Sequence, residues 1–533
     1  MKTNNIKRTN RGIFILFLCV GLLSITSCEK DFGDINDNYE AKLYDATVPG
    51  LFNDLIAKTV KTGAHHRIPV SWLYQWSQLA GMYAASGYRL DDFTTAPWEG
   101  YYRSLANVQD IENLIAENPL AANMTNISQM TKVIMAYRTL TTTLMYGDMP
   151  YSEAGKGFFG PEGFRPVYDS QQSIMESAID DLTSAVNNLS TSTSQVSLGS
   201  FDTLFGNDID MWITFANSLR LRYAMAMREK NASFADPIIT DALSKPLLAA
   251  DEYISLDPAS ISGLSLDRAG MYRGNSYMRM GSTMWNAMSS SDDVDGSGIY
   301  DLRCKIFFEA NASDEWVPYP QVSDLTTPIV TGNPNVAARV TGDWTAGRSN
   351  FSSFNVYFTE DTTIPQFLIT GTQISFIKAE LYNRGIAGVT ANPTMAETFY
   401  NEGITESVKF WYKHANGSAI WTVNKPAAEP TTLELDAMLT DPNVAYSATP
   451  ATALSQIYKQ SWISLLHQPF EAWTLQRRTN NATPNVSLPE TSLVTNFNRV
   501  TYPPSERETN RVNWQTASRN GSDAETDPIW IQP

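Results

Sequence analysis

The residue whose chemistry is best defined by its neighbours is Cys28. It follows the segment 24–27, Ser-Ile-Thr-Ser, which is typical of a bacterial lipobox. In such a motif the thiol receives a diacylglycerol through a thioether, and cleavage then makes the cysteine the first residue. Upstream, four basic residues precede an apolar run at 12–23 that is too short to cross a bilayer. The sequence therefore predicts a signal peptide at 1–27 and a lipid anchor on Cys28; the alternative is an ordinary secretory signal with a chance cysteine.

Patterns for catalysis or metal binding are weak. No HExxH or comparable metal spacing occurs among the four histidines, which are His65, His66, His414 and His467. The sequence has neither a GxSxG nucleophile elbow nor a phosphate-binding loop. Segment 291–296 resembles the start of a calcium loop, but Leu302 stands where an EF-hand requires Glu. We predict no catalytic residue, metal or cofactor. A surface-anchored glycoside hydrolase stays as an alternative, because 56 acidic residues could always supply a carboxylate pair.

Two clusters in predicted loops combine aromatic rings with polar side chains. Aromatic faces suit the CH surfaces of a sugar, and amide, carboxylate or guanidinium groups suit its hydroxyls. The first cluster contains Tyr88, Arg89, Asp91, Asp92 and Trp98. The second cluster contains Tyr272, Arg273, Asn275, Tyr277, Trp285, Trp316 and Tyr319. We take these residues as candidate ligand contacts. Three tryptophans at apolar helical positions are instead expected to pack in the core, namely Trp212, Trp411 and Trp462.

Three other residues with reactive or charged groups are expected to be structural. Arg477 and Arg478 should satisfy buried carbonyls or pair with Glu471. Cys304 is the one cysteine that remains once Cys19 has left with the signal peptide and Cys28 carries lipid. No disulfide can then form within one mature chain, and Cys304 should behave as a small core residue.

The charge of the chain excludes one class of partner. The net charge is −17 over 533 residues, and residues 1–27 carry four basic and no acidic groups. The mature part therefore has 35 basic against 56 acidic groups, a net charge of −21. Such a surface repels phosphate backbones, so nucleic acid is not expected as a partner.

A tether followed by a mainly helical body is predicted after the signal peptide. Residues 28–44 include a polar, acidic stretch without a helical stripe and should tether the body, 45–533, to the lipid. Apolar residues recur at steps of three and four in three segments, 130–144, 169–189 and 212–227. These stripes predict antiparallel helix pairs. Asp169 and Gln172 are expected to form the capping box of the second helix.

The character of the sequence changes between about 250 and 372. Gly, Ser, Asp, Thr and Pro accumulate, and short β-type runs appear at 355–358 and 367–369. A loop-rich insertion of this length is usually functional. Helical patterns return in three segments, 373–384, 394–411 and 451–467. The predicted fold class is therefore mainly α, with helix pairs and a loop-rich insertion that contains short β segments.

Several strings resemble those of the SusD-like family. The segment 146–154, Tyr-Gly-Asp-Met-Pro-Tyr-Ser-Glu-Ala, is similar to the family's YGDxPYSEA. Further similar strings follow in the family's order: Pro166–Asp169, Ile179–Leu182, Trp212–Arg222, Asp301–Arg303, Ile374–Gly385, Tyr458–Gln460, Glu471–Trp473, Arg477–Thr479, Tyr502–Pro503, Glu506 and Asn510. One departure is Leu302, where the family commonly has Pro between Asp and Arg. Together with the lipobox, these matches run from Cys28 to near the carboxyl end.

The resemblance implies a function as well as a fold. It implies tetratricopeptide-like helix pairs, a loop-rich face that binds ligand, and no catalysis. It also implies a partner, a SusC-like TonB-dependent outer-membrane barrel over which the lipoprotein closes as a lid. The expected ligand is an oligosaccharide, with oligopeptide as the alternative, and the expected location is the outer membrane, anchored by lipid and facing outward. Since a fold does not choose its ligand, these remain expectations.

Overall fold

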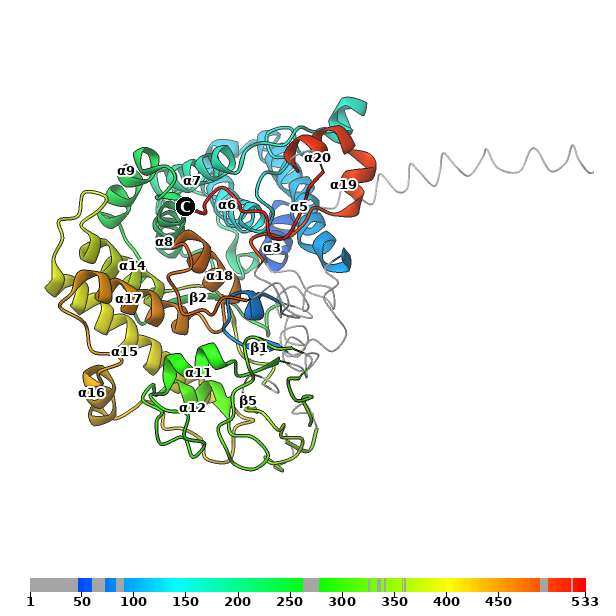
Figure 1. Ribbon diagram of the computed structural model, residues 1–533. Helices are drawn as coiled ribbons and strands as arrows, with labels where there is room; N and C mark the ends of the chain where they lie inside the picture. Colours follow the sequence, from blue (N-terminus) through cyan, green and yellow to red (C-terminus); the bar gives the residue numbers. More distant parts are fainter. Residues whose placement is uncertain are drawn as a thin grey trace, which may run out of the picture.

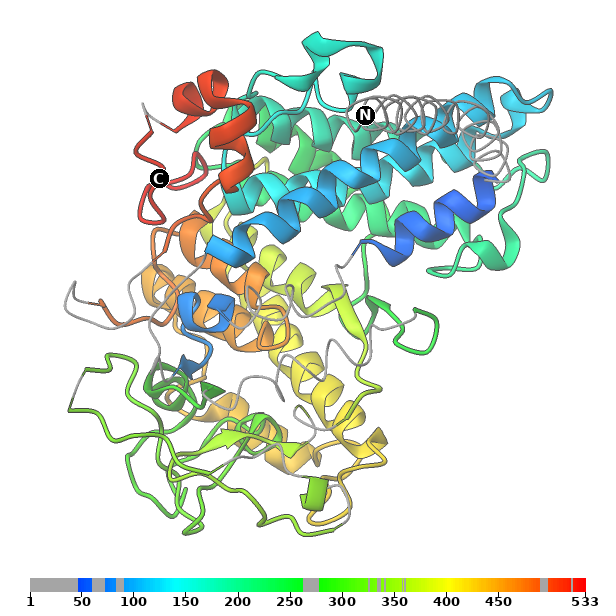
Figure 2. The ribbon, with the colours of Figure 1, turned by 90° about the vertical axis from the view of Figure 1, so that its right-hand side faces the viewer.

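A computed structural model (Figures 1 and 2) gives the fold of most of the chain. It describes residues 47–59, 72–82, 91–261, 278–324, 326–332, 337–339, 342–356, 358, 361–488, 497–518 and 521–533. Cys28 and the tether 28–44 therefore lie outside the described residues. Within these ranges, no helix combines the length and the apolar character that crossing a bilayer requires.

The first half of the chain forms long helices that pack in chain order. They are α3 (Val48–Ala57), α5 (Asp91–Ala116), α6 (Thr125–Tyr146), α7 (Gln171–Asn188), α8 (Ile209–Met227) and α9 (Ala232–Leu243). Helix α6 packs on α7, α7 on α8, and α8 on α9. The apolar stripes predicted within 130–144, 169–189 and 212–227 are buried between them. The prediction of a mainly helical fold is confirmed.

Helix α7 begins one residue later than the sequence predicts. Its N-cap is Ser170, whose hydroxyl accepts a hydrogen bond from the amide of Ser173. The expected capping box of Asp169 and Gln172 is therefore wrong. The Asp169 carboxylate instead accepts hydrogen bonds from the backbone amides of Tyr151 (3.0 Å) and Ser152 (2.8 Å), because these open amides of the preceding turn lie closer to it.

The second half adds a further set of helices beside the first. They are α14 (Gly371–Arg384), α15 (Pro393–Gly417), α16 (Thr432–Thr440), α17 (Pro450–Ser464), α18 (Pro469–Arg478), α19 (Pro504–Thr509) and α20 (Arg511–Ala517). Helix α14 packs on α15 and α17, while α14 and α18 both contact α8. Gly385 ends α14 in a left-handed conformation with φ 62°, as expected for a C-cap glycine.

The loop-rich region lies beside these helices, in the lower part of Figure 1. Strands β2 (Tyr253–Leu256) and β6 (Gln366–Thr370) pair antiparallel at its two ends. Between them lie β3 (Met278–Arg279), α11 (Ser282–Met288), α12 (Cys304–Phe307), β4 (Phe308–Glu309) and β5 (Ser353–Phe354). The β-type run expected at 367–369 is part of β6, whereas the run expected at 355–358 follows the strand β5.

Short 3-10 turns and a buried cysteine complete the description of the fold. Short 3-10 turns occur at η1 (Ala121–Asn123), η2 (Lys156–Phe159), η3 (Pro161–Phe164), η4 (Gly199–Phe201) and η5 (Ala337–Arg339). Cys304 is buried with no exposed area in a second apolar core, which α11 and α12 share with α15 and α17. Burial raises the pKa of its thiol. The prediction that Cys304 is a core residue is confirmed.

Candidate functional site

A short strand pair connects the two loop clusters that the sequence singles out. Strand β1 (Gly81–Met82) pairs antiparallel with β3, with Met82 opposite Met278. Segment 83–90 leaves the sheet directly after Met82, and segment 262–277 enters it directly before Met278. Both segments are therefore attached at the same end of the pair. They carry six of the candidate contacts, which lie outside the described residues: Tyr88, Arg89, Tyr272, Arg273, Asn275 and Tyr277.

Gln78 precedes β1 and links it by hydrogen bonds to other parts of the chain. Its backbone is left-handed, with φ 56°, although it is not a glycine, and its side chain has no exposed area. Its amide nitrogen donates to the carbonyl of Val486 (2.7 Å), and its amide oxygen accepts from Thr283 Oγ1 and from the Val486 amide (both 2.8 Å). Non-glycine residues adopt this conformation where surrounding contacts enforce it, often near functional sites. Two distant segments are thus fixed to the residues that lead into β1.

Close backbone contact fixes the other side of the pair. Gly281 follows β3 and forms an isolated parallel bridge with Tyr319. A Cβ on Gly281 would lie 2.8 Å from the amide nitrogen of Gly81 and 2.3 Å from Gln321 Oε1. This approach therefore requires glycine. Gln321 also donates to the carbonyl of Ala80 (3.1 Å), which joins the insertion to the start of β1.

Trp316 is the described aromatic candidate that keeps a partly open surface. It is half-buried and stacks on Trp285, with ring centroids 6.0 Å apart and 14° between the planes. Trp285 is buried, and its indole nitrogen donates to Asp292 Oδ1 (3.2 Å). The backbone of Trp316 is fixed by a hydrogen bond from its amide to the carbonyl of Val294 (2.7 Å). The ring thus rests on a rigid support at the edge of the insertion.

The turn whose carbonyl at Val294 accepts the Trp316 amide is segment 291–296, which resembles the start of a calcium loop. Its three carboxylates, Asp292, Asp293 and Asp295, are exposed. In the described part of the chain, no group of three His, Cys, Asp or Glu residues could hold a metal ion. A half-buried indole beside exposed carboxylates has the chemistry that a sugar requires, an aromatic face with hydroxyl acceptors next to it.

The remaining candidates are either buried or have side chains outside the described set. Trp98 is 4% exposed and packs against Tyr102, Tyr146 and Tyr502, with centroid distances of 5.1, 5.0 and 5.6 Å. Tyr319 is 1% exposed and meets Phe351 edge to face at 5.1 Å. Two further candidates, whose side chains are outside the described set, begin α5: Asp91 and Asp92. The structure therefore brings Trp285, Trp316 and Tyr319 to the region of β3, and places Trp98 in the core near α6.

The string 146–154 forms part of that core. Met149 pairs with Asp169 in an isolated antiparallel bridge. The carboxylate of Asp148 accepts a hydrogen bond from the amide of Gln171 (2.8 Å), as expected of a turn residue that binds backbone amides. The Tyr502 hydroxyl donates to the carbonyl of Asp148 (2.7 Å). These strings therefore join helix ends and the carboxyl-terminal segment and leave few groups open to a ligand.

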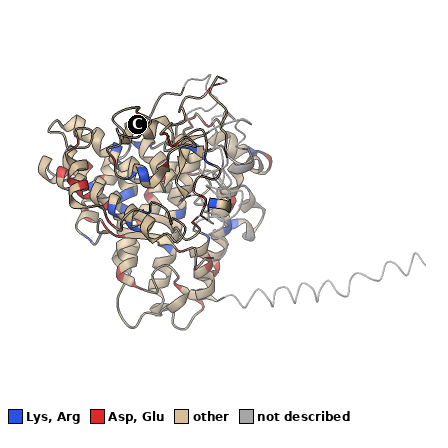
Figure 3. Cartoon of the chain, turned by 90° about the horizontal axis from the view of Figure 1, so that it is seen from below, with Lys and Arg blue, Asp and Glu red and all other residues tan. Residues whose placement is uncertain are grey.

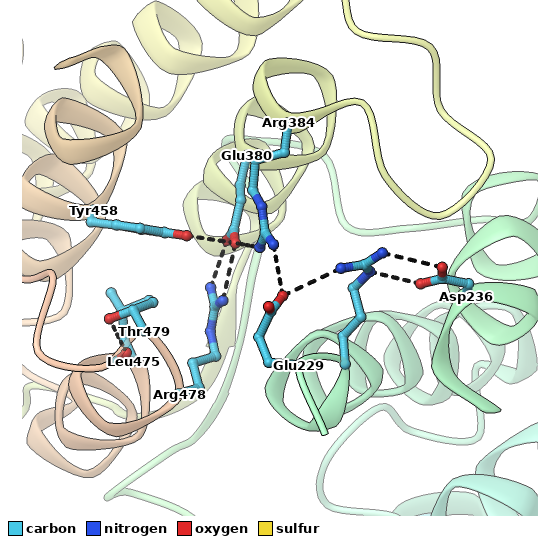
Figure 4. Close-up of polar contacts among 9 residues, drawn as sticks. Glu229, Asp236, Glu380, Arg384, Tyr458, Leu475, Arg478 and Thr479 are labelled. Atoms are coloured by element: carbon cyan, nitrogen blue, oxygen red, sulfur yellow. Dashed lines mark hydrogen bonds and ion pairs between the residues drawn. The ribbon is translucent and has the colours of Figure 1, made fainter. Parts of the chain in front are cut away.

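Buried arginines connect the helices in the same way. Glu380 accepts hydrogen bonds from Arg478 (2.8 Å), Arg384 (2.9 Å) and the Tyr458 hydroxyl (2.8 Å), as Figure 4 shows. Burial would raise the pKa of Glu380, but Arg478 and Arg384 outweigh it, and the pKa lies below its usual range. Arg384 also pairs with Glu229 (2.7 Å), which extends the network to the turn after α8.

The two adjacent arginines of α18 differ in their partners. Arg477 donates to the carbonyls of Leu144 (2.7 Å) and Asn498 (2.9 Å), which confirms the prediction that it satisfies buried carbonyls. The pairing of Arg478 with Glu471 is wrong: Arg478 binds Glu380, and Glu471 faces Arg222 at 3.4 Å. The expected buried positions of Trp212, Trp411 and Trp462 are confirmed.

Lys and Arg positions are spread over several described helices in the view of Figure 3 and do not form one continuous stripe there. The half-buried histidine His414 packs among aromatic rings, and burial lowers its pKa to about 4. It is therefore neutral near pH 7, as expected of a packed core residue.

Comparison with known proteins gives both a family and a fold. The model of a family described as starch-binding and associating with the outer membrane matches residues 41–503. A solved chitin-binding protein superposes with a TM-score of 0.67 at 23% identity, covering 91% of this chain and all of the other. A chitin-binding SusD homologue from Flavobacterium johnsoniae gives 0.62 at 18% identity, covering 91% and 98%. A SusD-like protein from Bacteroides thetaiotaomicron gives 0.66 at 18% identity, covering 91% and 99%. No curated protein sequence matches significantly.

Proposed function

The chain belongs to the SusD-like family of starch-binding, outer-membrane-associated proteins, and from this premise we propose that it captures oligosaccharides and does not alter them chemically. The proposal extends to lipid anchorage through Cys28 with the body facing outward. It also includes delivery of the captured glycan to a SusC-like TonB-dependent barrel. A surface lipoprotein cannot move a ligand across a membrane by itself, so a channel has to receive what it binds.

The observation that carries the proposal is the arrangement at β1 and β3. Met82 and Met278 pair directly, and the segments rich in aromatic and polar candidates adjoin these two residues. Trp316 is half-buried in the same region of the chain, next to three exposed carboxylates. We propose that the glycan binds on this face, with Trp316 as the aromatic platform and the candidates of segments 83–90 and 262–277 around it. We assign no ligand contact to Trp98, Trp285 or Tyr319, because their side chains are buried.

The capture of glycan is tested with the soluble mature chain and two panels, one of polysaccharide-derived oligosaccharides and one of peptides. We expect saturable binding to one class of glycan and none to peptides. Binding to peptides alone would replace the ligand class with oligopeptide. Release of reducing ends that persists through purification would replace the binding function with that of a glycoside hydrolase.

Anchorage is tested by metabolic labelling with a radioactive fatty acid. The wild-type protein should be labelled, and Cys28→Ala should not, while both fold alike. Equal labelling of the two proteins would place the lipid on another residue.

The barrel partner is tested by gentle detergent extraction and pull-down on this chain from cells that express the neighbouring transporter. We expect a stable complex with a barrel of much greater mass. Recovery of the lipoprotein alone from those cells would argue for an unpartnered surface binder.

A further inference from the structure

A cavity lies between the helices, separate from the face around Trp316. Its volume is about 160 Å³, and its walls come from α5, α6, β6 and the start of α18. Apolar side chains dominate these walls, including Leu73, Pro97, Met145, Phe367 and Phe470. Lys58 also lines the cavity and is exposed, so one wall reaches the protein surface. The cavity shares no described residue with the face around Trp316.

A buried carboxylate forms part of the cavity lining. Glu471 is 8% exposed, and its partner is Arg222, whose Nη2 lies 3.4 Å from Oε1. Among the described residues, none donates a hydrogen bond to this carboxylate. Burial raises the pKa of Glu471, although Arg222 and Arg477 act in the opposite direction. A buried carboxylate that accepts no hydrogen bond from the described residues thus belongs to a residue that lines a mainly apolar cavity, a state that is costly unless a ligand or water completes it.

Donor groups line the same cavity. The amide oxygen of Gln468 accepts a hydrogen bond from Gln373 (2.6 Å), while its amide nitrogen donates none within the described part of the chain. Arg138 is buried, and its Nε has no acceptor. Its terminal nitrogens are already engaged, since they donate to the carbonyls of Gly100 and Lys58. The side chain of Gln366, at the start of β6, forms no hydrogen bond with a described residue.

This combination selects a class of ligand. An anion would meet the carboxylate of Glu471, and a cation would meet the guanidinium of Arg138. A hydroxyl group can both donate and accept, so it can satisfy the free amide of Gln468 and the carboxylate together. Apolar walls suit the CH faces of a ring that carries such hydroxyls. The enclosed volume suits one ring of this kind and excludes a chain of them.

We infer that this cavity is a second ligand subsite that binds one neutral sugar unit, either a monosaccharide or the terminal unit of a glycan chain. The inference rests on the proposed capture of glycan and adds to it recognition of a chain end. The open face around Trp316 would then hold several units, and the cavity would hold one.

The test fills the cavity, and its first variant leaves the polar groups of the lining in place. Thr141 lines the cavity on α6, and its hydroxyl donates to backbone carbonyls of its own helix. Thr141→Phe therefore removes volume and little else. Thr183 on α7 is the matched control, because it is also half-buried, donates to its own helix and does not line the cavity. Gln366→Phe is a second filling variant, in case Thr141→Phe does not fold.

Binding is measured by calorimetry with the neutral monosaccharide that makes up the best oligosaccharide, and with that oligosaccharide. We expect a filling variant to weaken monosaccharide binding at least tenfold, while Thr183→Phe and Trp316→Ala leave it unchanged. Oligosaccharide binding should persist in the filling variants and fall in Trp316→Ala. Equal monosaccharide binding by the wild type and both filling variants, or no monosaccharide binding by the wild type, would overturn the second subsite. In those cases intact oligosaccharide binding would leave the proposed function standing, whereas its absence would overturn that function as well.

Discussion

Trp98 and Trp316 both stand beside acidic residues in the sequence, yet the two regions around them use an indole differently. Trp98 lies in α5, is 4% exposed, and is enclosed by the rings of Tyr102, Tyr146 and Tyr502. Trp316 stacks on one ring, that of Trp285, and stays half-buried. The first ring has no free face for a ligand, and the second keeps part of its surface open.

Polar groups in the two regions follow the same contrast. Around Trp98, the family string 146–154 is hydrogen-bonded to Asp169, Gln171 and Tyr502. Around Trp316, the carboxylates of Asp292, Asp293 and Asp295 are exposed. The family string 146–154 thus stabilises the scaffold, whereas the proposed glycan face around Trp316 keeps polar groups exposed. Stability and glycan affinity should therefore respond to different substitutions.

The largest effect on stability is expected from Glu380→Ala. This change leaves Arg478 and Arg384 without their buried carboxylate, and removal of one partner of a buried ion pair typically costs about 3–5 kcal/mol. Urea unfolding followed by circular dichroism measures the loss. Arg103→Ala, which breaks an exposed pair with Glu99 on α5, is the control and should change stability little. Reduced glycan affinity in folded Glu380→Ala, measured at low temperature, would contradict the separation of scaffold and face.

Acidification should weaken the same network. Burial raises the pKa of Glu380, but Arg478 and Arg384 lower it further, so its folded pKa lies below the unfolded value of about 4.3. Its contribution to stability is therefore present above that pH and is lost as the pH falls through the folded pKa. The free energy of unfolding of the wild type should decrease below about pH 4.3 more steeply than that of Glu380→Gln. Parallel pH profiles for the two proteins would show that the network does not hold the carboxylate ionised.

Trp316→Ala should have the opposite effects to Glu380→Ala: it should lower glycan affinity and change stability little. We expect glycan affinity to fall at least tenfold, about 1.4 kcal/mol, because a tryptophan platform contributes much of the contact with a sugar. The unfolding midpoint should change much less than the affinity does. Trp530→Ala, another half-buried tryptophan, is the matched control and should bind normally. Equal affinity of Trp316→Ala and the wild type would remove Trp316 from the site.

The smallest effect is expected at a helix remote from both regions. Thr431 forms a capping box with Glu434 at the start of α16. Thr431→Ala should cost about 1 kcal/mol of stability, the usual contribution of an N-cap side chain, with unchanged glycan affinity. Thermal unfolding measures this change. Thr440→Ala at the other end of α16 is the control, since its hydroxyl caps no helix start, and it should cost less than Thr431→Ala.

Local patterns predicted the helices because each apolar stripe is complete within one segment. The stripes within 130–144, 169–189 and 212–227 are buried where the sequence predicts them. The ion-pair partner of Arg478 was harder to predict, because the carboxylate of Glu380 is 98 residues away in the chain. Glu471 was the nearer carboxylate in sequence, but it faces Arg222 from α8 instead.

The candidate site was predicted only in part. Aromatic and polar composition indicated Trp98 and Trp316 alike, and the sequence around each residue does not reveal which rings will cover it. Strands β1 and β3 have two residues each and pair across almost 200 positions, so no periodic pattern in the sequence predicts them. The cavity lined by Glu471 and Gln468 is assembled from several elements that lie far apart in the sequence. Such sites arise from tertiary packing and leave no local signal.

The central claim is that glycan binds on the face formed around the strand pair and Trp316. Hydrogen exchange of the mature chain, with and without the oligosaccharide that binds best, tests this claim most directly. The account predicts slower exchange around Trp316 and in the residues that adjoin Met82 and Met278, with exchange in α7 and α8 unchanged. Slower exchange confined to the helices α6–α9, with none near Trp316, would contradict it.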